Sequence, residues 1–419
     1  MKSFLITTLG CKVNTYESQA IRELLQQNGY IESDNPDYII VNTCAVTSTA
    51  EHKSRQKVSS LGKKYPNSVL IVCGCSSNLH ALDYQKIHNV KIIIGNNNHS
   101  EIPYLIDEYE KTKELIIKND TDFRHRKYQN LRISSFEEKV RSFVKIGDGC
   151  NNFCSYCVIP LSRGNLRSRP KGEIICEIQS LINNGYQEIV LTGIDSASYG
   201  YEFKDYHFND LLSDIVKIPG LKRLRISSLE ASQIDDDFIS LMKNYPIIAP
   251  HLHIPLQSGS DTVLKRMKRK YTCDEFYQKI LKIKEAFPLI ALACDVIVGF
   301  PQESEKEFNE TYEFIQKCGF AFLHVFPYSP REGTIAAKMD GQIDEKTKKD
   351  RVKRLIKLGQ KLSSEYKNRF IGQELSILIE DYDEKKQMYH GLSENYLDCY
   401  VKSQTNIINS FIKIKYGKE

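Results

Sequence analysis

The feature that most constrains this chain is an alternation of short apolar runs with amphipathic stretches, repeated in two blocks along its 419 residues. Such an alternation predicts parallel sheets, because two parallel strands need a crossover connection that is usually a helix. A chain of this length exceeds one ordinary domain and can bury two or three cores. We therefore predict an α/β protein with a separate sheet for each block.

The first block has the pattern of a small doubly wound domain. Its amphipathic stretches include residues 17–27, and its apolar runs are residues 4–9, 38–41, 69–72 and 90–94. Residues 111–138 are rich in charge and lack a clear period, which is typical of a linker. We predict an N-terminal doubly wound parallel-sheet domain over residues 1–125.

The second block has six strand candidates with helical patterns between them. The strand candidates are residues 143–146, 189–192, 224–226, 251–255, 293–298 and 323–326. The helical patterns are residues 172–182, 208–216, 274–286 and 305–316. These βα units predict a partial (β/α)6 barrel over residues 136–365. A small C-terminal β module is predicted over residues 366–419, with strands at residues 375–380, 396–402 and 407–415.

Three cysteines follow the first predicted barrel strand in a C-x3-C-x2-C spacing, as Cys150, Cys154 and Cys157. This loop would lie at the carboxyl face of the barrel, where such folds place their chemistry. Most ferredoxin-type clusters take four thiolates, so three thiolates leave one iron of a cubane cluster open. An open iron can bind a cofactor, as radical chemistry with S-adenosylmethionine requires. The alternative is a zinc site, but no histidine lies between His125 and His207 to complete it.

Three more cysteines follow strands of the first block. Cys11 follows the first predicted strand, Cys44 the second and Cys75 the third. Because the carboxyl ends of parallel strands share one edge of a sheet, these thiols can converge and hold a second cluster. Cys73 competes with Cys75, since residues two apart in a strand face the same side. Three buried structural cysteines are the alternative, because cysteine packs as a small hydrophobe.

The compartment is predicted from the cysteines and the apolar content. The first ten residues hold an apolar run too short for a secretory signal, and no apolar stretch approaches the roughly 20 residues that cross a bilayer. Twelve cysteines without an export signal indicate metal or redox chemistry in a reducing compartment. We expect a cytoplasmic protein without membrane contact, whose formal charge of +5 permits a polyanionic partner.

The barrel cysteines and two downstream segments resemble the radical S-adenosylmethionine superfamily. Its signature is C-x3-C-x2-C with an aromatic residue before the last cysteine, where this chain has Tyr156. Thr192 and Gly193 resemble the segment beside the amino group of the cofactor, and Val298 begins a segment like the late glycine-containing strand. The resemblance implies contacts from these four residues to S-adenosylmethionine, and a catalytic [4Fe-4S] cluster on Cys150, Cys154 and Cys157.

With both cysteine sets present, the chain resembles the methylthiotransferase family over nearly its full length. That family has a cluster domain, a radical barrel and a TRAM module, in the order predicted here. Its third cysteine follows a glycine and precedes small residues, which selects Cys75 over Cys73. Residues 159–169 also match, whereas Asp195 and Gln302 depart from the residues common in the family. The resemblance implies that a second [4Fe-4S] cluster binds to Cys11, Cys44 and Cys75.

The resemblance also implies the substrate. The family methylthiolates adenosine 37 of certain tRNAs, carrying an isopentenyl or a threonylcarbamoyl group, or an aspartate of a ribosomal protein. Residues 225–230 resemble the threonylcarbamoyl subgroup, so we expect N6-threonylcarbamoyladenosine, with isopentenyladenosine-37 and the aspartate as alternatives. Within this segment Ser228 and Glu230 are expected to bind the cofactor. The residues expected to bind substrate phosphates or its carboxylate are Arg163, Arg167 and Arg169.

The expected partners are the anticodon stem-loop of tRNA and an electron donor such as flavodoxin or ferredoxin. Two basic segments suit phosphates: residues 265–270, and residues 343–369 with ten Lys or Arg against four Asp or Glu. Either could instead be a solvated surface. Residues 366–419 have no net charge, so RNA binding through them alone is not implied. A protein that only carries electrons or iron is a further alternative, although it would not need the cofactor segments.

Overall fold

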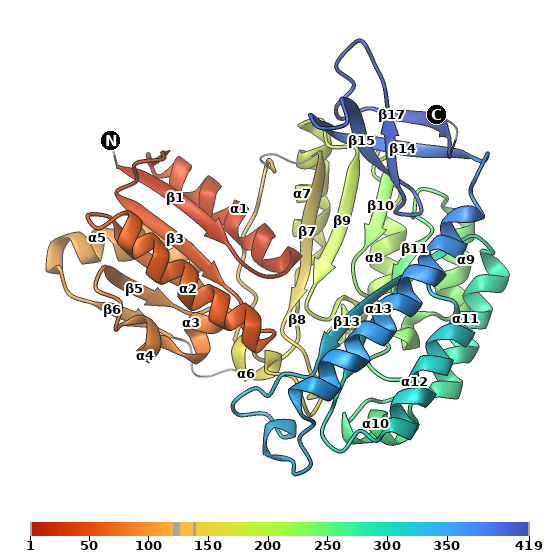
Figure 1. Ribbon diagram of the computed structural model, residues 1–419. Helices are drawn as coiled ribbons and strands as arrows, with labels where there is room; N and C mark the ends of the chain where they lie inside the picture. Colours follow the sequence, from red (N-terminus) through yellow and green to blue (C-terminus); the bar gives the residue numbers. More distant parts are fainter. Residues whose placement is uncertain (1, 120–125, 137–139, 418–419) are drawn as a thin grey trace.

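The computed structural model describes residues 2–119, 126–136 and 140–417. Its N-terminal part is a parallel sheet of order β2-β1-β3-β4-β5-β6 (Figure 1). The strands are β1 (Ser3–Thr8), β2 (Ile31–Glu32), β3 (Tyr38–Thr43), β4 (Val69–Gly74), β5 (Val90–Ile94) and β6 (Ile116–Lys118). The central strands are buried on both faces, as a sheet covered by helices on both sides requires.

Helices cover both faces of this sheet, so the predicted doubly wound arrangement is confirmed. Side chains of α1 and α5 pack with one face, and those of α2 and α4 with the other. The helices of this part are α1 (Lys12–Gln27), α2 (Ser48–Lys64), α3 (Cys75–Leu79), α4 (Ala81–Tyr84), η1 (His99–Glu101) and α5 (Ile102–Thr112).

Two features of the N-terminal part differ from the sequence expectation. Helix α1 begins at Lys12, directly after Cys11, and not at residue 17. Strand β6 lies inside the stretch that was expected to be a linker, where it pairs in parallel with β5. Because β6 is a short, partly exposed edge strand with only two apolar residues, it shows no alternation from which a strand could be recognised.

The central part is a partial barrel built from two sheets, of order β10-β9-β7-β8 and β11-β12-β13. All neighbouring strands are parallel except β7 and β8. Isolated bridges between Leu224 and Ile248 and between Ser228 and His253 connect the two sheets. The strands are β7 (Arg141–Asp148), β8 (Arg167–Ser168), β9 (Glu188–Gly193), β10 (Arg223–Ile226), β11 (His251–His253), β12 (Ala291–Val298) and β13 (Phe322–Pro327).

Helices surround the barrel strands and enclose the largest apolar core of the molecule. Capping boxes at the start of α11, Thr272 with Glu275, and of α12, Ser304 with Glu307, satisfy the first free amides of these helices. The helices are α6 (Ile159–Arg163), α7 (Lys171–Asn183), α8 (Phe208–Ile215), α9 (Asp236–Asn244), α10 (Asp261–Arg266), α11 (Cys273–Ala286), α12 (Glu305–Cys318) and α13 (Glu345–Asn368). The 3-10 turns are η2 (Ser196–Ser198), η3 (Ala231–Gln233) and η4 (Ala336–Lys338).

The C-terminal part is the expected small β module, an antiparallel sheet of order β16-β15-β14-β17. Its strands are β14 (Glu374–Asp383), β15 (Met388–Ser393), β16 (Asp398–Val401) and β17 (Phe411–Lys415). The sequence reading missed β15, since its glycine and histidine interrupt the apolar alternation. Figure 1 shows this sheet (blue) above the amino ends of the barrel strands, with α13 leading up to it.

Helix α1 joins the N-terminal sheet to the barrel. Tyr16 and Ala20, on the face of α1 turned to the barrel, belong to the barrel's apolar core. The hydroxyl of Tyr16 donates to an oxygen of Glu177 on α7 at 3.0 Å, and both residues are buried. Glu17 has no exposed side-chain surface and forms ion pairs with Lys145 and Arg163 of the barrel. The two parts are therefore packed as one body along this helix.

Candidate functional site

The three barrel cysteines lie in the loop that follows β7, as expected. The loop turns through Gly149 and Phe153, which both have positive φ, and the amide of Cys157 donates to the carbonyl of Cys154 at 3.0 Å. Cys150 lies beside the Asp195 carboxylate, with Sγ 3.5 Å from Oδ2. Burial raises the pKa of the Cys157 thiol to about 12.

The N-terminal cysteines follow three adjacent strands of the first sheet. Cys11 comes after β1, Cys44 directly after β3, and Cys75 directly after β4. Burial, followed by the proximity of Cys75 and Cys11, raises the pKa of Cys44 to about 12. The three thiols thus lie within electrostatic reach of one another at the carboxyl edge of the sheet.

Cys73 lies elsewhere, although it is only two residues from Cys75. It is fully buried in the apolar core shared with α1 and α5, and its Sγ lies 3.7 Å from the carbonyl oxygen of Val41. Cys75 instead begins α3 and packs with Ala45 and Val158. The positive φ of Gly74, at 101°, breaks the strand alternation between the two cysteines.

The two groups of cysteines lie close to each other across the contact between the barrel and the N-terminal sheet. Val158, next to Cys157, packs against Cys75 in one small buried cluster. Cys75 is also among the groups whose proximity raises the pKa of Cys157. Two clusters bound at these positions would therefore be neighbours.

The donor sets fit iron-sulfur clusters. Each group offers three cysteines, and arginines add hydrogen bonds to the sulfurs: Arg163 Nε donates to Cys75 Sγ at 3.2 Å, and a guanidinium nitrogen of Arg269 to Cys154 Sγ at 3.5 Å. Among the described residues, no three Cys, His, Asp or Glu side chains are arranged to hold a single metal ion. A cubane cluster does not need such an arrangement, because each thiolate binds a different iron.

The arginines expected to bind substrate have other partners. Arg163 and Arg169 are fully buried, and their guanidinium groups bond to Glu17 and Asp148 and to Glu177, respectively. Arg167 is 8% exposed and donates to the carbonyl oxygens of Arg163 and Asn165. In this structure these arginines thus bond to other groups of the protein, and their contact with substrate stays a prediction.

The residues expected to bind the cofactor are divided among three cavities and one buried strand end. Tyr156 lines a cavity of about 210 Å³ together with Cys157. Thr192, Gly193 and Ser228 line a larger chamber. Glu230 lines a pocket beside Cys154, and Val298 is buried at the end of β12.

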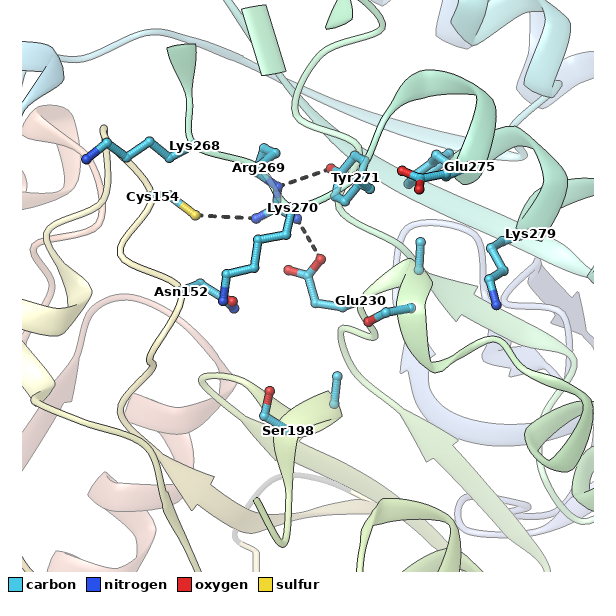
Figure 2. A pocket seen from close by; sticks show the side chains of 14 residues that line it. Asn152, Cys154, Ser198, Glu230, Lys268, Arg269, Lys270, Tyr271, Glu275 and Lys279 are labelled. Carbon is cyan, nitrogen blue, oxygen red and sulfur yellow. Dashed lines mark hydrogen bonds and ion pairs between the residues drawn. The ribbon is translucent and has the colours of Figure 1, made fainter. Parts of the chain in front are cut away.

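The pocket beside Cys154 has a volume of about 350 Å³ and is shown in Figure 2. Arg269 lies at its centre, with one nitrogen 2.6 Å from Glu230 Oε2 and another near Cys154 Sγ. Lys270 extends into the pocket toward Asn152 (Figure 2). The basic segment at 265–270 is thus divided, because Arg266 pairs with Glu307 on α12 while Arg269 and Lys270 face this pocket.

The chamber, of about 870 Å³, is bordered by all three parts of the molecule. Cys11 and Lys12 come from the N-terminal sheet, and Thr192 and Ser228 from the carboxyl ends of barrel strands. The barrel interior adds His251, His253, Asp295 and His324, and the β module adds Glu380, His390, Tyr396 and Asp398. A space of this size accommodates a ligand as large as a nucleoside.

Histidines and aromatic rings give the chamber its walls. The rings of His253 and His324 stack with centroids 5.4 Å apart, and those of His251 and Tyr396 with centroids 4.5 Å apart. Burial and the nearby Arg225 hold the pKa of His251 well below its usual value, so this ring is neutral. The sequence reading missed the chamber. The only available signal was the alternation of His251 and His253 in one strand, which places both side chains on the same face.

No helix in the described part of the chain is long and apolar enough to cross a membrane.

Two family models match the chain. The Radical SAM superfamily matches residues 144–315, and a family described as Uncharacterized protein family UPF0004 matches residues 3–95. The first contains the barrel cysteines, and the second contains Cys11, Cys44 and Cys75.

Several curated proteins are similar over most of their length. The threonylcarbamoyladenosine tRNA methylthiotransferase MtaB of Bacillus subtilis is 42% identical, over 100% of this chain and 94% of that protein. The protein of the same name from Aquifex aeolicus is 35% identical, over 93% of this chain and 94% of that protein. The tRNA-2-methylthio-N(6)-dimethylallyladenosine synthase of Thermodesulfovibrio yellowstonii is 36% identical, over 92% and 89%, respectively.

Solved structures are similar in fold at low sequence identity. The radical S-adenosylmethionine methyltransferase TsrM from Kitasatospora setae, solved with cobalamin and a [4Fe-4S] cluster, has a TM-score of 0.58 at 13% identity, covering 79% of this chain and 77% of that one. The cobalamin-dependent S-adenosylmethionine radical enzyme OxsB has a TM-score of 0.52 at 11% identity, covering 87% and 56%. At these identities, both similarities concern the fold alone.

Proposed function

The chain belongs to the family of radical S-adenosylmethionine methylthiotransferases, and we propose that it converts N6-threonylcarbamoyladenosine at position 37 of tRNA to its 2-methylthio derivative. The observation that supports this most is the chamber that Cys11 shares with residues at the carboxyl ends of barrel strands β9 and β10. Cys11 of one group lines the same space as Thr192, Gly193 and Ser228, which follow the barrel strands next to the other group. The proposed substrate is the one that the names of the Bacillus and Aquifex relatives contain.

The barrel cysteines are the proposed catalytic centre. Cys150, Cys154 and Cys157 would hold a [4Fe-4S] cluster, which together with S-adenosylmethionine supplies a 5'-deoxyadenosyl radical that removes hydrogen from an unactivated carbon. Arg269 holds the Cys154 sulfur by a hydrogen bond and is itself fixed by Glu230. The proposed cofactor contacts are Tyr156, Thr192, Gly193, Ser228, Glu230 and Val298.

A second [4Fe-4S] cluster on Cys11, Cys44 and Cys75 belongs to the same proposal. Its role would be to hold the sulfur that is methylated and attached to the substrate carbon. The placement of Cys75 beside Val158 supports this role, since sulfur and carbon radical must be brought together. The hydrogen bond from Arg163 to Cys75 favours the thiolate form that a cluster needs.

The tRNA would present a single nucleotide to the chamber. The C2 atom of an adenine in a stack is out of reach, so the enzyme requires a splayed loop base. Phosphates have a candidate surface on α13, where exposed lysines repeat at helical spacing: Lys346, Lys349, Lys353 and Lys357. In the described residues none of these four has a carboxylate at ion-pair distance, whereas Lys348, Arg351 and Arg354 of the same helix have such partners.

The proposal includes a low-potential electron donor such as flavodoxin or ferredoxin, because reductive cleavage of S-adenosylmethionine consumes an electron. A cytoplasmic location follows from a tRNA substrate and from oxygen-sensitive clusters that need a reducing compartment.

The test is mass spectrometry of nucleosides from bulk tRNA of a strain that lacks this gene, beside its parent. We expect selective loss of 2-methylthio-threonylcarbamoyladenosine, with N6-threonylcarbamoyladenosine accumulating in its place. The wild-type gene should restore the product and Cys154→Ala should not. Loss of the 2-methylthio derivative of isopentenyladenosine instead would assign the other tRNA substrate, and an unchanged profile would point to the ribosomal aspartate.

A further inference from the structure

Lys12 is a cation on the chamber wall that has no carboxylate partner among the described residues. It directly follows Cys11 at the start of α1 and lines the chamber wall. Within residues 2–119, 126–136 and 140–417, no carboxylate lies at ion-pair distance from its ammonium group. A half-buried ammonium group without an anion is costly, because its lost hydration is not replaced. Such a group is therefore suited to an anion that enters with a ligand.

The other cations around the chamber are already paired within the protein. Arg141 Nε lies 2.8 Å from Glu380 Oε1. Arg225 Nε lies 2.6 Å from Glu188 Oε1, and its terminal nitrogens donate to two backbone carbonyls of the β module. An incoming anion would have to displace these partners, whereas Lys12 has none to displace.

The chamber carboxylates have other neighbours. Glu380 is paired with Arg141, Asp295 Oδ2 lies 2.9 Å from His253 Nε2, and Asp398 Oδ1 lies 3.2 Å from His390 Nε2. Among the described residues, none of these three carboxylates lies at ion-pair distance from the Lys12 ammonium group.

We propose that Lys12 selects the substrate by pairing its ammonium group with the free carboxylate of the threonylcarbamoyl group. The inference rests on the proposed function, which supplies a nucleoside whose modification is anionic. An isopentenyl group at the same place would leave the ammonium group desolvated and unpaired. A site with a buried polar group rejects a ligand that cannot form a hydrogen bond or ion pair with that group. Lys12 would therefore favour binding of the nucleoside with the acidic modification and disfavour binding of the one with the apolar modification.

The test compares equilibrium binding of two RNAs by the enzyme reconstituted with iron and sulfide and saturated with S-adenosylmethionine. One is an anticodon stem-loop with N6-threonylcarbamoyladenosine at position 37, and the other carries the methyl ester of the same group. We expect the wild-type enzyme to bind the acid about tenfold more tightly than the ester, the gain of one charge-assisted contact. Lys12→Met should reduce this ratio to about one, while Lys12→Arg should retain most of it.

The ratio of the two affinities separates the inference from a general loss of structure or cluster, since both RNAs meet the same protein. Lys53→Met, at an exposed position on α2, is the matched control and should keep the wild-type ratio. Equal binding of acid and ester by the wild-type enzyme would overturn the role of Lys12, and so would an undiminished ratio in Lys12→Met. A wild-type enzyme that binds the modified stem-loop no better than one with plain adenosine, and does not convert it, would contradict the proposed function itself.

Discussion

Nε of Arg163 donates a hydrogen bond of 3.2 Å to Sγ of Cys75, across the contact between the barrel and the N-terminal sheet. Arg163 ends helix α6, which begins two residues after Cys157. The same guanidinium group bonds to Glu17 of α1 and to Asp148 at the end of β7. One buried side chain thus ties both cysteine groups to the helix that connects the two parts.

Replacing Arg163 by methionine should destabilise the protein strongly. The change leaves Glu17 buried with Lys145 as its cation, and Asp148 with Lys145 and a longer contact of 3.7 Å to Arg167. Breaking a buried ion pair from one side costs about 3–5 kcal/mol. We expect the free energy of unfolding in urea to fall by that amount. Lys53→Met, at an exposed site, should have almost no effect. A variant as stable as the wild type would show that the network contributes little to holding the two parts together.

The iron content should separate Cys75 from Cys73. Cys75→Ala removes a proposed ligand of the second cluster, so iron and labile sulfide per reconstituted chain should fall to about half of the wild-type values. Cys73→Ala is the matched control, because Cys73 lies in the apolar core two residues away. It should lower stability modestly and leave the iron content unchanged. The reverse pattern would move the ligand to Cys73.

The stability of the protein should depend on pH through His251. Because its pKa is held well below the usual value, His251 stays neutral in the folded protein while the unfolded chain takes up a proton below pH about 6.5. The unfolded state then binds more protons, so stability falls as the pH falls, by up to about 1.4 kcal/mol per pH unit. His251→Phe should remove this part of the slope between pH 7 and 5 in urea unfolding. His88→Phe, at an exposed position, is the control, and equal slopes in all three proteins would refute the assignment.

The exposed lysines of α13 should contribute to RNA affinity through phosphates. Lys349→Gln combined with Lys353→Gln should weaken binding of the tRNA and reduce the slope of log affinity against log salt by about 0.7–0.9 for each lost contact. Lys361→Gln is the control on the same helix, since the Lys361 ammonium group lies 3.9 Å from a carboxylate oxygen of Glu365 and is therefore already paired within α13. An unchanged salt dependence in the double variant would remove α13 from the RNA-binding surface.

Much of the fold could be predicted from local patterns. The buried strands of both parallel sheets have apolar runs long enough to identify, and their ends were predicted to within a few residues. The missed strands were short or partly exposed: β2 and β8 with two residues each, β6 at a sheet edge, and β15 with a glycine in its middle. Such strands are stabilised by pairing with their neighbours, which a local pattern does not record.

By itself, the sequence determined that cysteines follow the parallel strands at the sheet edge where ligands gather, and that one triad has the spacing of a radical-enzyme cluster. Only the tertiary structure decided the roles of the charged side chains. Arg163 and Arg169 were expected to bind substrate but pair with buried carboxylates. Lys12, to which no sequence pattern gave a role, lines the chamber without a carboxylate partner among the described residues. The physical reason is that cysteine positions follow from strand periodicity, which is local, while the partner of a charge is decided by packing and can lie far away in the sequence, as Glu17 lies 146 positions from Arg163.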